Sequence, residues 1–275
     1  MTVLFQDQHL HSRHSFDSNA DPVANVQTAI DKGLSGLIFT EHFDIHPDDW
    51  KECVYNDTAY TETIQILRRD FGTRLFIGKG IEICFQPDHM AFILDFLDHH
   101  EFDMVMLSVH YAAGQAIHHR DLWQSTSPEE MTRQYLQNVL CATQFCRELR
   151  KNRGRVFDVL GHLDLAKRYT QRFFNTYSVT PFGDLLDEIL RTCLDADLIP
   201  EINTSSLRQG LQESMPGPDT VLRYARLGGR AMSVGSDSHR SEDIGAGFDV
   251  AASMLRAVNL RAAVFQARQC EFISP

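Results

Sequence analysis

Six short apolar runs in this chain are each followed closely by a signature that contains histidine or a carboxylate. The signatures are Asp7-Gln8-His9-Leu10-His11, Thr40-Glu41-His42, Gly80-Ile81-Glu82, Ser108-Val109-His110, Gly161-His162-Leu163-Asp164 and Ser236-Asp237-Ser238-His239. Segments with apolar residues at helical spacing lie between the runs. Strands that alternate with helices pair in parallel, and in such folds functional groups gather at the carboxyl ends of the strands. The pattern therefore predicts an α/β fold with a polar site at those ends.

Seven β/α units follow one another along the 275 residues. The expected strands are Val3–His9, Gly36–His42, Arg74–Glu82, Phe102–His110, Val156–His162, Leu198–Thr204 and Ala231–His239. The expected helices cover 21–33, 57–71, 89–99, a long segment that begins at Ser127-Pro128, 182–196, 219–227 and 250–257. Seven units that contribute ligands from almost every strand favour a closed or nearly closed barrel. The alternative, a doubly wound open sheet, places its ligand at one switch point.

The composition excludes several classes of function. A formal net charge of −11 argues against a general affinity for nucleic acid or anionic membranes. No apolar segment reaches transmembrane length, and Asp7 and His9 come too early for a signal peptide, so we expect a cytoplasmic protein. The six cysteines form no CxxC pair and no cluster near the histidine motifs. We therefore expect free thiols and a metal site built from nitrogen and oxygen ligands only.

The histidine and carboxylate signatures predict a polynuclear metal site. Residues two apart in a strand face the same side, so His9 and His11 can hold one ion together, as can Asp237 and His239. Asp17 follows in a polar loop and is preferred to the alternative, His14. The candidate ligands are His9, His11, Asp17, His42, Glu82, His110, His162, Asp237 and His239. This set suffices for two or three divalent ions of zinc, manganese or iron.

The predicted charge of this site points to a phosphate substrate. Two or three divalent ions outweigh the three carboxylates among the candidate ligands. A positive pocket in an acidic protein attracts phosphate and lowers the pKa of metal-bound water. The sequence thus favours a small phosphorylated metabolite as the partner. No aspartyl-phosphate motif, serine elbow or Walker loop offers another route to the chemistry.

In this order, the motifs HxH, a following Asp, TEH, GxE, SxH, GHxD and SDxH resemble the polymerase-and-histidinol-phosphatase superfamily. The resemblance runs from about Leu4 to Asp249. The stretches 158–169, 201–208 and 235–245 look like its histidinol-phosphate phosphatase branch. It implies a single metal-dependent phosphoesterase domain over residues 1–275, with a distorted seven-stranded (β/α)7 barrel. It also implies a di- or trinuclear centre held by the nine ligands named above.

The resemblance implies hydrolysis of a phosphate monoester, L-histidinol phosphate in the first place. Arg168 and Arg208 would hold the phosphate, since guanidinium groups match phosphate oxygens with forked hydrogen bonds. Asp164 would donate a proton to the leaving group or orient His162, and Asp7 would orient His9. His118 and His119, in a loop that resembles no family pattern, are expected to touch substrate. The alternatives are another phosphorylated metabolite or nucleotide, or a non-catalytic barrel that binds phosphate.

Overall fold

The computed structural model describes residues 6–45, 55–124 and 126–275. In these residues nine strands form one sheet in the order β1-β2-β3-β4-β7-β8-β9-β10-β11. Their bounds are β1 (Gln6–Leu10), β2 (Gly36–Phe43), β3 (Phe76–Cys84), β4 (Met104–Ser108), β7 (Val159–Leu160), β8 (Ile199–Asn203), β9 (Ala231–Gly235), β10 (Arg261–Gln266) and β11 (Gln269–Ile273). All neighbouring strands pair in parallel except β10 and β11, which form an antiparallel hairpin.

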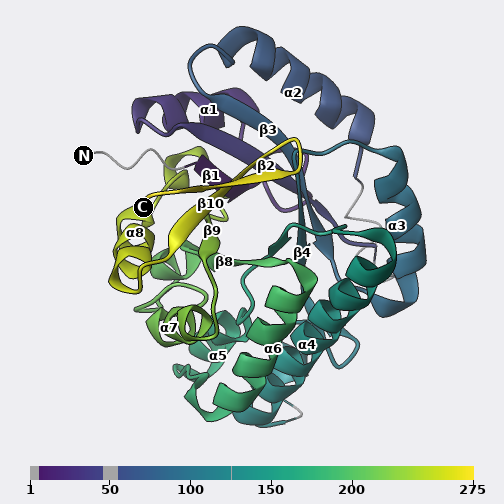
Figure 1. Ribbon diagram of the computed structural model, residues 1–275, viewed down its shortest axis with the longest axis vertical. Helices are drawn as coiled ribbons and strands as arrows, with labels where there is room; N and C mark the ends of the chain where they lie inside the picture. The colour runs from purple at the N-terminus through teal and green to yellow at the C-terminus, as the bar shows by residue number, and fades with distance from the viewer. Residues whose placement is uncertain (1–5, 46–54, 125) are drawn as a thin grey trace.

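Helices surround the strands (Figure 1). They are α1 (Pro22–Asp31), α2 (Asp57–Phe71), α3 (Met90–His99), α4 (Pro128–Arg153), α5 (Ala166–Phe174), α6 (Gly183–Ala196), α7 (Pro218–Arg226) and α8 (Phe248–Ala257). Short 3₁₀ turns cover 87–89, 120–123, 180–182, 205–208 and 241–243, and a small hairpin joins β5 (Tyr111–Ala112) to β6 (Gln115–Ala116). No helix in the described ranges has the length and apolar character needed to cross a bilayer.

The predicted α/β class is confirmed, but the predicted strand number is wrong. All seven predicted strands form, although residues 3–5 of the first lie outside the described residues and β7 is reduced to two residues. The C-terminal hairpin β10–β11 adds two strands to the sheet. Its first strand was missed because it follows α8 after only a few residues and carries no polar signature at its end. The helix α5 was also missed.

The first and last of the predicted strands meet at one edge. Leu10 and Ser238 form a parallel bridge, His11 N donates to Ser238 O (2.8 Å) and Asp237 N donates to His9 O (2.7 Å). This contact lies beyond the end of β9. Within the strands themselves, the side chain of Gln8 makes the link from β1 instead. A closed seven-stranded barrel is therefore not confirmed, and the observed sheet is mostly parallel with a partial link between β1 and β9.

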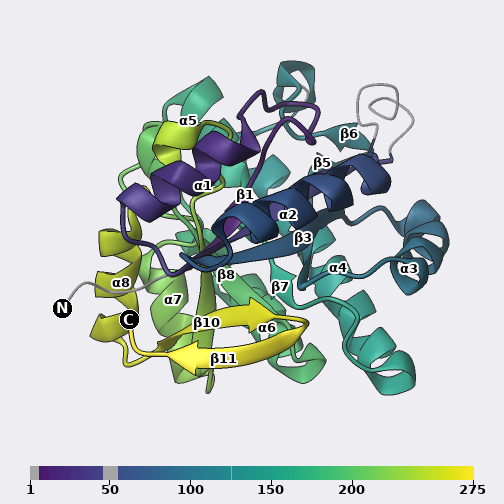
Figure 2. The ribbon, with the colours of Figure 1, turned by 90° about the horizontal axis from the view of Figure 1, so that it is seen from above.

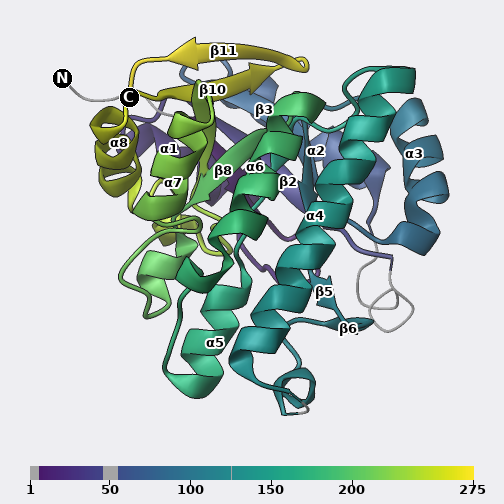
Figure 3. The ribbon, with the colours of Figure 1, turned by 60° about the horizontal axis from the view of Figure 1, so that its bottom comes forward.

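The two ends of the sheet differ in character. Figures 2 and 3 show the hairpin β10–β11 and the hairpin β5–β6 at opposite ends of the molecule. The turn of β10–β11 contacts residues that precede β4 and β7: Arg268 N donates to Asp103 O (2.9 Å), and the Arg268 guanidinium pairs with Asp158 (2.5 Å). The hairpin therefore covers the amino ends of the strands, and the polar signatures lie at the other end.

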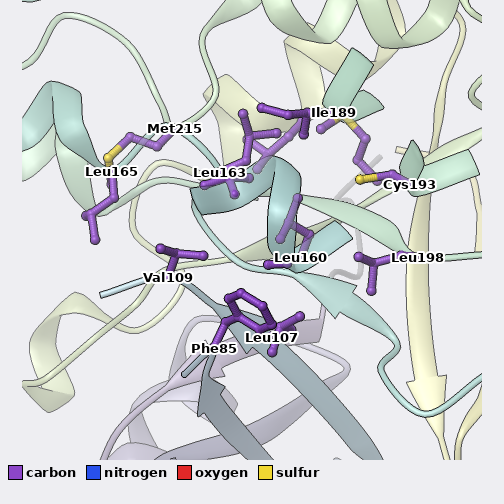
Figure 4. Close-up of a cluster of buried hydrophobic side chains, with 14 of the residues drawn as sticks. Phe85, Leu107, Val109, Leu160, Leu163, Leu165, Ile189, Cys193, Leu198 and Met215 are labelled. Atoms are coloured by element: carbon purple, nitrogen blue, oxygen red, sulfur yellow. The ribbon is translucent and has the colours of Figure 1, made fainter. Parts of the chain in front are cut away.

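Apolar side chains fill both faces of the sheet. Ile38, Met104, Val159, Ile199 and Phe265 form one buried cluster between the strands and the C-terminal hairpin. A larger cluster packs the outward side chains of β4 and β7 against α4 and α6. Figure 4 shows part of it, with Leu107 of β4 beside Phe85, and with Leu160 of β7 and the α6 residues Ile189 and Cys193 in the same cluster. Both faces thus carry buried apolar clusters, and most of the candidate ligands lie at or beyond the carboxyl ends of the strands.

The Gln8 carboxamide links β1 to β10, and its loss should destabilise the fold. Its Nε2 donates to Ala263 O (2.5 Å) and its Oε1 accepts from Phe265 N (2.9 Å). Gln8→Ala leaves both buried backbone groups without a partner, at roughly 1–3 kcal/mol each. We expect urea unfolding of the metal-free protein to show a loss of about 2–6 kcal/mol in the free energy of unfolding. The control Gln266→Ala removes an exposed side chain from β10 and should stay within about 0.5 kcal/mol; an equal effect of both variants would contradict the assignment.

Candidate metal centre

The carboxylate of Glu82 lies at the middle of the polar end of the sheet and is completely buried. Imidazole nitrogens from separate strands and loops converge on it. Within the described residues the distances to its oxygens are 3.0 Å from His162 Nε2, 3.1 Å from His42 Nδ1, 3.3 Å from His9 Nε2, 3.3 Å from His110 Nε2 and 3.5 Å from His11 Nε2. One carboxylate thus contacts five of the predicted ligands.

The other two predicted carboxylates extend this group. Asp237 Oδ1 lies 3.5 Å from His11 Nε2 and 3.6 Å from His239 Nδ1. Asp17 Oδ2 lies 3.0 Å from His239 Nε2 and 3.5 Å from His42 Nε2. The structure therefore brings all nine predicted ligands into one connected cluster. The alternative to Asp17, His14, is directed elsewhere, with its Nε2 2.9 Å from Thr63 Oγ1.

Local backbone features aim these side chains. The register between β1 and β2 shifts between Asp7 and Leu10, which is a bulge that changes the direction of side chains along β1. His9 can enter the interior because Gly235 of β9 has no side chain: a Cβ there would lie 2.3 Å from the His9 Cβ and from Glu201 Oε1. The bulge and the missing Cβ together bring His9 up against Glu82.

Several imidazoles are held from behind by groups that the sequence prediction missed. His9 Nδ1 donates to Glu201 Oε1 (2.7 Å) and His110 Nδ1 donates to Asp44 Oδ2 (2.9 Å). His11 Nδ1 contacts Ser15 Oγ (3.1 Å), which itself donates to Glu41 (2.5 Å). These contacts leave the other ring nitrogen of each imidazole to face the cluster, as in many metal sites. The only sequence signal for Glu201 is an acidic residue inside an apolar strand, as for Glu82.

The predicted role of Asp7 is wrong. Its carboxylate accepts from the backbone N–H groups of Ser236 (2.9 Å), Gly245 (2.8 Å) and His9 (3.4 Å), and the His9 ring is held by Glu201 instead. Asp7 thus fixes the backbone that follows β9. The prediction rested on the spacing of two residues, which the bulge in β1 makes unreliable.

Charge coupling within the cluster is strong. Burial raises the pKa of Glu82, but the charges of His9, His42 and His110 outweigh it and hold that pKa well below its usual range. Burial lowers the pKa of His42, while Asp17 and Glu82 raise it to about 9. For His11, burial and the nearby charges of His42 and His239 lower the pKa to about 3. Without ions, therefore, some imidazoles carry protons that balance the buried carboxylates.

The donor set fits divalent metal ions. Four triplets each offer three ligand atoms within 4.8 Å of one another: His11/His42/His239, His9/His162/Asp237, His9/His11/Glu82 and His42/Glu82/His110. Among the residues that the structure describes, His11 Nε2 and His42 Nδ1 are buried and have no hydrogen-bond partner. Orphaned ring nitrogens in a polar cluster are what a metal ion would satisfy, and nitrogen and oxygen ligands suit zinc, manganese and iron.

One expectation about cysteine is wrong. Cys84, at the end of β3, is buried, and its sulfur forms a further triplet with Asp44 and His110 within the same 4.8 Å limit. The sequence predicts no cysteine cluster near the histidine motifs. The strand β3 brings Cys84 there because Cys84 follows Glu82 by two residues and so faces the same side. A thiol thus lies at the edge of the cluster.

A cavity opens over this cluster, and it contains some of the predicted substrate contacts. It is lined by Phe16, Asp17, His42, Asp44, Glu82, His110, Ala116, His118, His162, Leu165, Arg168, Asp237 and His239. Arg168 donates to Asp237 Oδ2 (3.0 Å) and Ser205 Oγ (2.6 Å), while its Nε is buried and has no hydrogen-bond partner in the described ranges. His118 lines the cavity and packs its ring edge against His119, which is not among the lining residues.

Two predicted catalytic residues lie behind the cavity wall. Arg208 donates to the backbone oxygen of Ser236 (2.8 Å) and lies 3.4 Å from Asp243. Asp164 is fully buried and pairs with Lys167 at 2.8 Å. Neither is among the residues that line the cavity. Their contacts give both a structural role in this arrangement, and the predicted catalytic roles stay predictions.

The fold and the cluster define an α/β protein with a histidine- and carboxylate-rich centre suited to metal ions. A model of the PHP domain matches residues 7–205, and a probable histidinol-phosphatase of Clostridium acetobutylicum is 30% identical over 274 residues, which cover 97% of this chain and 98% of that protein. The chain therefore belongs to the PHP domain family.

Two further proteins extend the comparison. A probable histidinol-phosphatase of Deinococcus radiodurans is 28% identical over 270 residues, covering 96% of this chain and 98% of that protein. A crystal structure of histidinol phosphate phosphatase from Lactococcus lactis, complexed with zinc, L-histidinol and phosphate, has a TM-score of 0.82 at 25% identity. That match covers 98% of this chain and 99% of the other. The likeness thus extends over almost the whole chain.

Removing the charge behind His9 should weaken metal binding. Glu201→Gln keeps the shape of the side chain but replaces the carboxylate that receives His9 Nδ1–H. Loss of such a partner typically lowers metal affinity by about 10- to 100-fold. Competition titration of zinc against a chelator would measure the change. The control Glu188→Gln alters an exposed residue of α6 and should bind zinc as the unaltered protein does; equal affinity of both variants would contradict a role for Glu201.

Zinc affinity should increase with pH. Below about pH 9 His42 holds a proton in the ion-free protein, and an ion can use that ring only after the proton leaves. Affinity should therefore fall as the pH decreases from 9 to 6, because proton competition grows. Titrations in metal buffers across this range would measure the slope. An affinity that is constant across the range would show that protons and ions do not compete here.

Proposed function

We propose that this chain is a metal-dependent phosphate-monoester hydrolase that converts L-histidinol phosphate into L-histidinol and phosphate. The observation that carries the proposal is the cluster itself: five imidazoles around the buried Glu82 carboxylate, with the Arg168 guanidinium on the same cavity. The similarity to histidinol-phosphatases over nearly the full length supports the substrate. The zinc, L-histidinol and phosphate named for the Lactococcus lactis structure support the same chemistry.

We infer that His9, His11, Asp17, His42, Glu82, His110, His162, Asp237 and His239 hold two or three divalent ions, zinc in the first place. When bound, such ions lower the pKa of water, orient the substrate and compensate charge at the phosphate. Two of the four triplets, His11/His42/His239 and His9/His162/Asp237, have no residue in common, which supports more than one ion. Glu82 would be one of the residues that hold the ions, since both of its oxygens face imidazoles.

The remaining side chains of the cavity would bind and orient the substrate. Arg168 is held by Asp237 and Ser205 and would contact phosphate oxygens with its free edge. His118 would contact the organic part of the substrate from the wall of the cavity, with His119 packed behind it. Arg208 would act by fixing the backbone of Ser236, next to Asp237. Phe16 and Leu165 offer apolar surface for a ring.

We also infer a single catalytic domain, with the parallel strands arranged as a distorted barrel of seven β/α units. The link between β1 and the segment after β9 supports this arrangement. It would place ligands from both ends of the strand order next to each other, as the cluster requires. A biosynthetic role fits the cytoplasmic location that the sequence predicts.

A phosphate-release assay would test the proposed function. The protein would be stripped with a chelator, reloaded with zinc, manganese or iron, and offered L-histidinol phosphate beside a panel of nucleotides and sugar phosphates. We expect release from L-histidinol phosphate that disappears after chelation and returns on reloading. Strong release from another metabolite would redirect the substrate. Metal-independent binding of phosphate without release would favour a non-catalytic barrel.

Loss of Arg168 should reduce catalysis without removing the ions. Arg168→Ala deletes a charged donor to phosphate, and hydrogen bonds to charged groups contribute roughly 1.5–3 kcal/mol, which corresponds to about 10- to 150-fold in kcat/KM. Metal content per chain should stay unchanged. The control Arg172→Ala removes an exposed arginine from the same helix and should leave kcat/KM within about twofold. An unchanged kcat/KM in Arg168→Ala would remove Arg168 from the site.

A further inference from the structure

Asp44 lies just beyond the end of β2 and lines the cavity over the cluster. Its side chain is buried, with 4% of its surface exposed. One oxygen, Oδ2, accepts from His110 Nδ1 at 2.9 Å. The other, Oδ1, is buried and has no hydrogen-bond partner in the described part of the chain. Asp44 therefore uses only half of its carboxylate within the protein.

A buried carboxylate oxygen without a donor is unfavourable. It has lost its hydration, and the hydrogen bonds that would replace water are missing. Buried polar atoms of this kind are uncommon in folded proteins, and those that line a cavity are often satisfied by a ligand. A ligand that offers a positively charged donor would satisfy Asp44 Oδ1 best, because bonds between ionised groups are the stronger ones.

Asp44 and Arg168 contact the Glu82 cluster through different residues. Arg168 contacts Asp237, whose other oxygen faces His11. Asp44 contacts His110, whose second nitrogen faces Glu82. Both side chains line the cavity, so its wall offers a cationic group and, apart from the candidate ligands, an anionic one. A ligand that carries both a phosphate and a cation matches this pair of charges.

We propose that Asp44 Oδ1 receives the ammonium group of the substrate, and that Asp44 selects phosphate monoesters of amino alcohols over those that lack the amine. This inference rests on the proposed function, since L-histidinol phosphate carries an amine on the carbon next to the phosphorylated CH₂ group. The amine is only a few bonds from the ester oxygen. Only the His110 imidazole separates Asp44 from Glu82. The phosphate and the ammonium group of the substrate can therefore find partners within one cavity.

The same geometry allows one competing role. Asp44, Cys84 and His110 offer three ligand atoms within 4.8 Å, so Asp44 could hold a metal ion instead of an ammonium group. The substitution Asp44→Asn separates the two roles. It keeps an oxygen that accepts from His110 Nδ1–H, so the ring stays oriented, and it removes the negative charge. A lost ammonium contact and a lost metal ligand then give different readouts.

The experiment compares two substrates in the zinc-loaded enzyme. One is L-histidinol phosphate and the other is its deamino analogue, 3-(imidazol-4-yl)propyl phosphate. For Asp44→Asn we expect kcat/KM with L-histidinol phosphate to fall about 10- to 100-fold, mainly through KM, as for loss of a charged hydrogen bond. The analogue should stay within about twofold, and metal content should not change. Asp44→Glu, which keeps the charge, should retain part of the preference for the amine. The control Asp95→Asn changes an exposed residue of α3 and should alter neither substrate.

Each other outcome overturns the inference in a distinct way. Equal losses for both substrates at unchanged metal content would mean that Asp44 acts only by orienting His110. A lower metal content in Asp44→Asn would make Asp44 a ligand. An unaltered preference for the amine would place the ammonium group elsewhere in the cavity. If the unaltered enzyme releases no phosphate from L-histidinol phosphate, the proposed function itself fails and the inference fails with it.

Discussion

The buried carboxylate of Glu82 is the interaction on which the functional end of this molecule depends. An isolated ionised carboxylate in a dry interior is strongly unfavourable, so it must be surrounded by cations or strong donors. Here the surrounding groups are imidazoles that arrive from β1, β2 and the loops after β4 and β7. An imidazole ring nitrogen can bind either a proton or a metal ion. The cluster can therefore exchange protons for metal ions without changing its framework.

The strands can bring these imidazoles together because glycines leave space on the interior side of the sheet. Gly235 makes room for His9, and Gly161 lies so close to Ser108 that a Cβ there would be 2.3 Å from its Oγ. Nearer the amino ends the same face carries the apolar residues Ile38, Met104 and Val159. On this face of the sheet, the side chains thus change from apolar near the amino ends of the strands to polar near the carboxyl ends, over a few residues. Apolar packing stabilises the amino ends of the strands, and the candidate ligands occupy the carboxyl ends.

The sequence predicted which side chains lie together at the polar end of the sheet, and it predicted the groups that contact them poorly. A His or Glu at the end of an apolar run is a local signal, and all nine candidates lie in one cluster. The partners Glu201 and Asp44 depend on which strand lies beside which, and no local pattern records that. The expectation for Asp7 was wrong because of the bulge in β1. A spacing of two residues determines the direction of a side chain only in a regular strand. The hairpin β10–β11 carries no histidine or carboxylate signature at the end of its first strand, and for that reason the strand number was underestimated.

The neighbouring residues Lys167 and Arg168 explain why Asp164 lies behind the cavity wall. Lys167 is almost completely buried, and its Nζ contacts Asp164 Oδ2 (2.8 Å), Glu213 Oε1 (2.7 Å) and Ser214 O (3.1 Å). A buried ammonium requires such a set of acceptors, and losing one would leave an uncompensated charge. These contacts fix the first turn of α5 to the segment that precedes α7. Because Arg168 is the next residue in that turn, its guanidinium is directed to Asp237 and the cavity. The GHxD signature thus has two uses: its histidine joins the cluster, while its aspartate anchors the helix that presents the arginine.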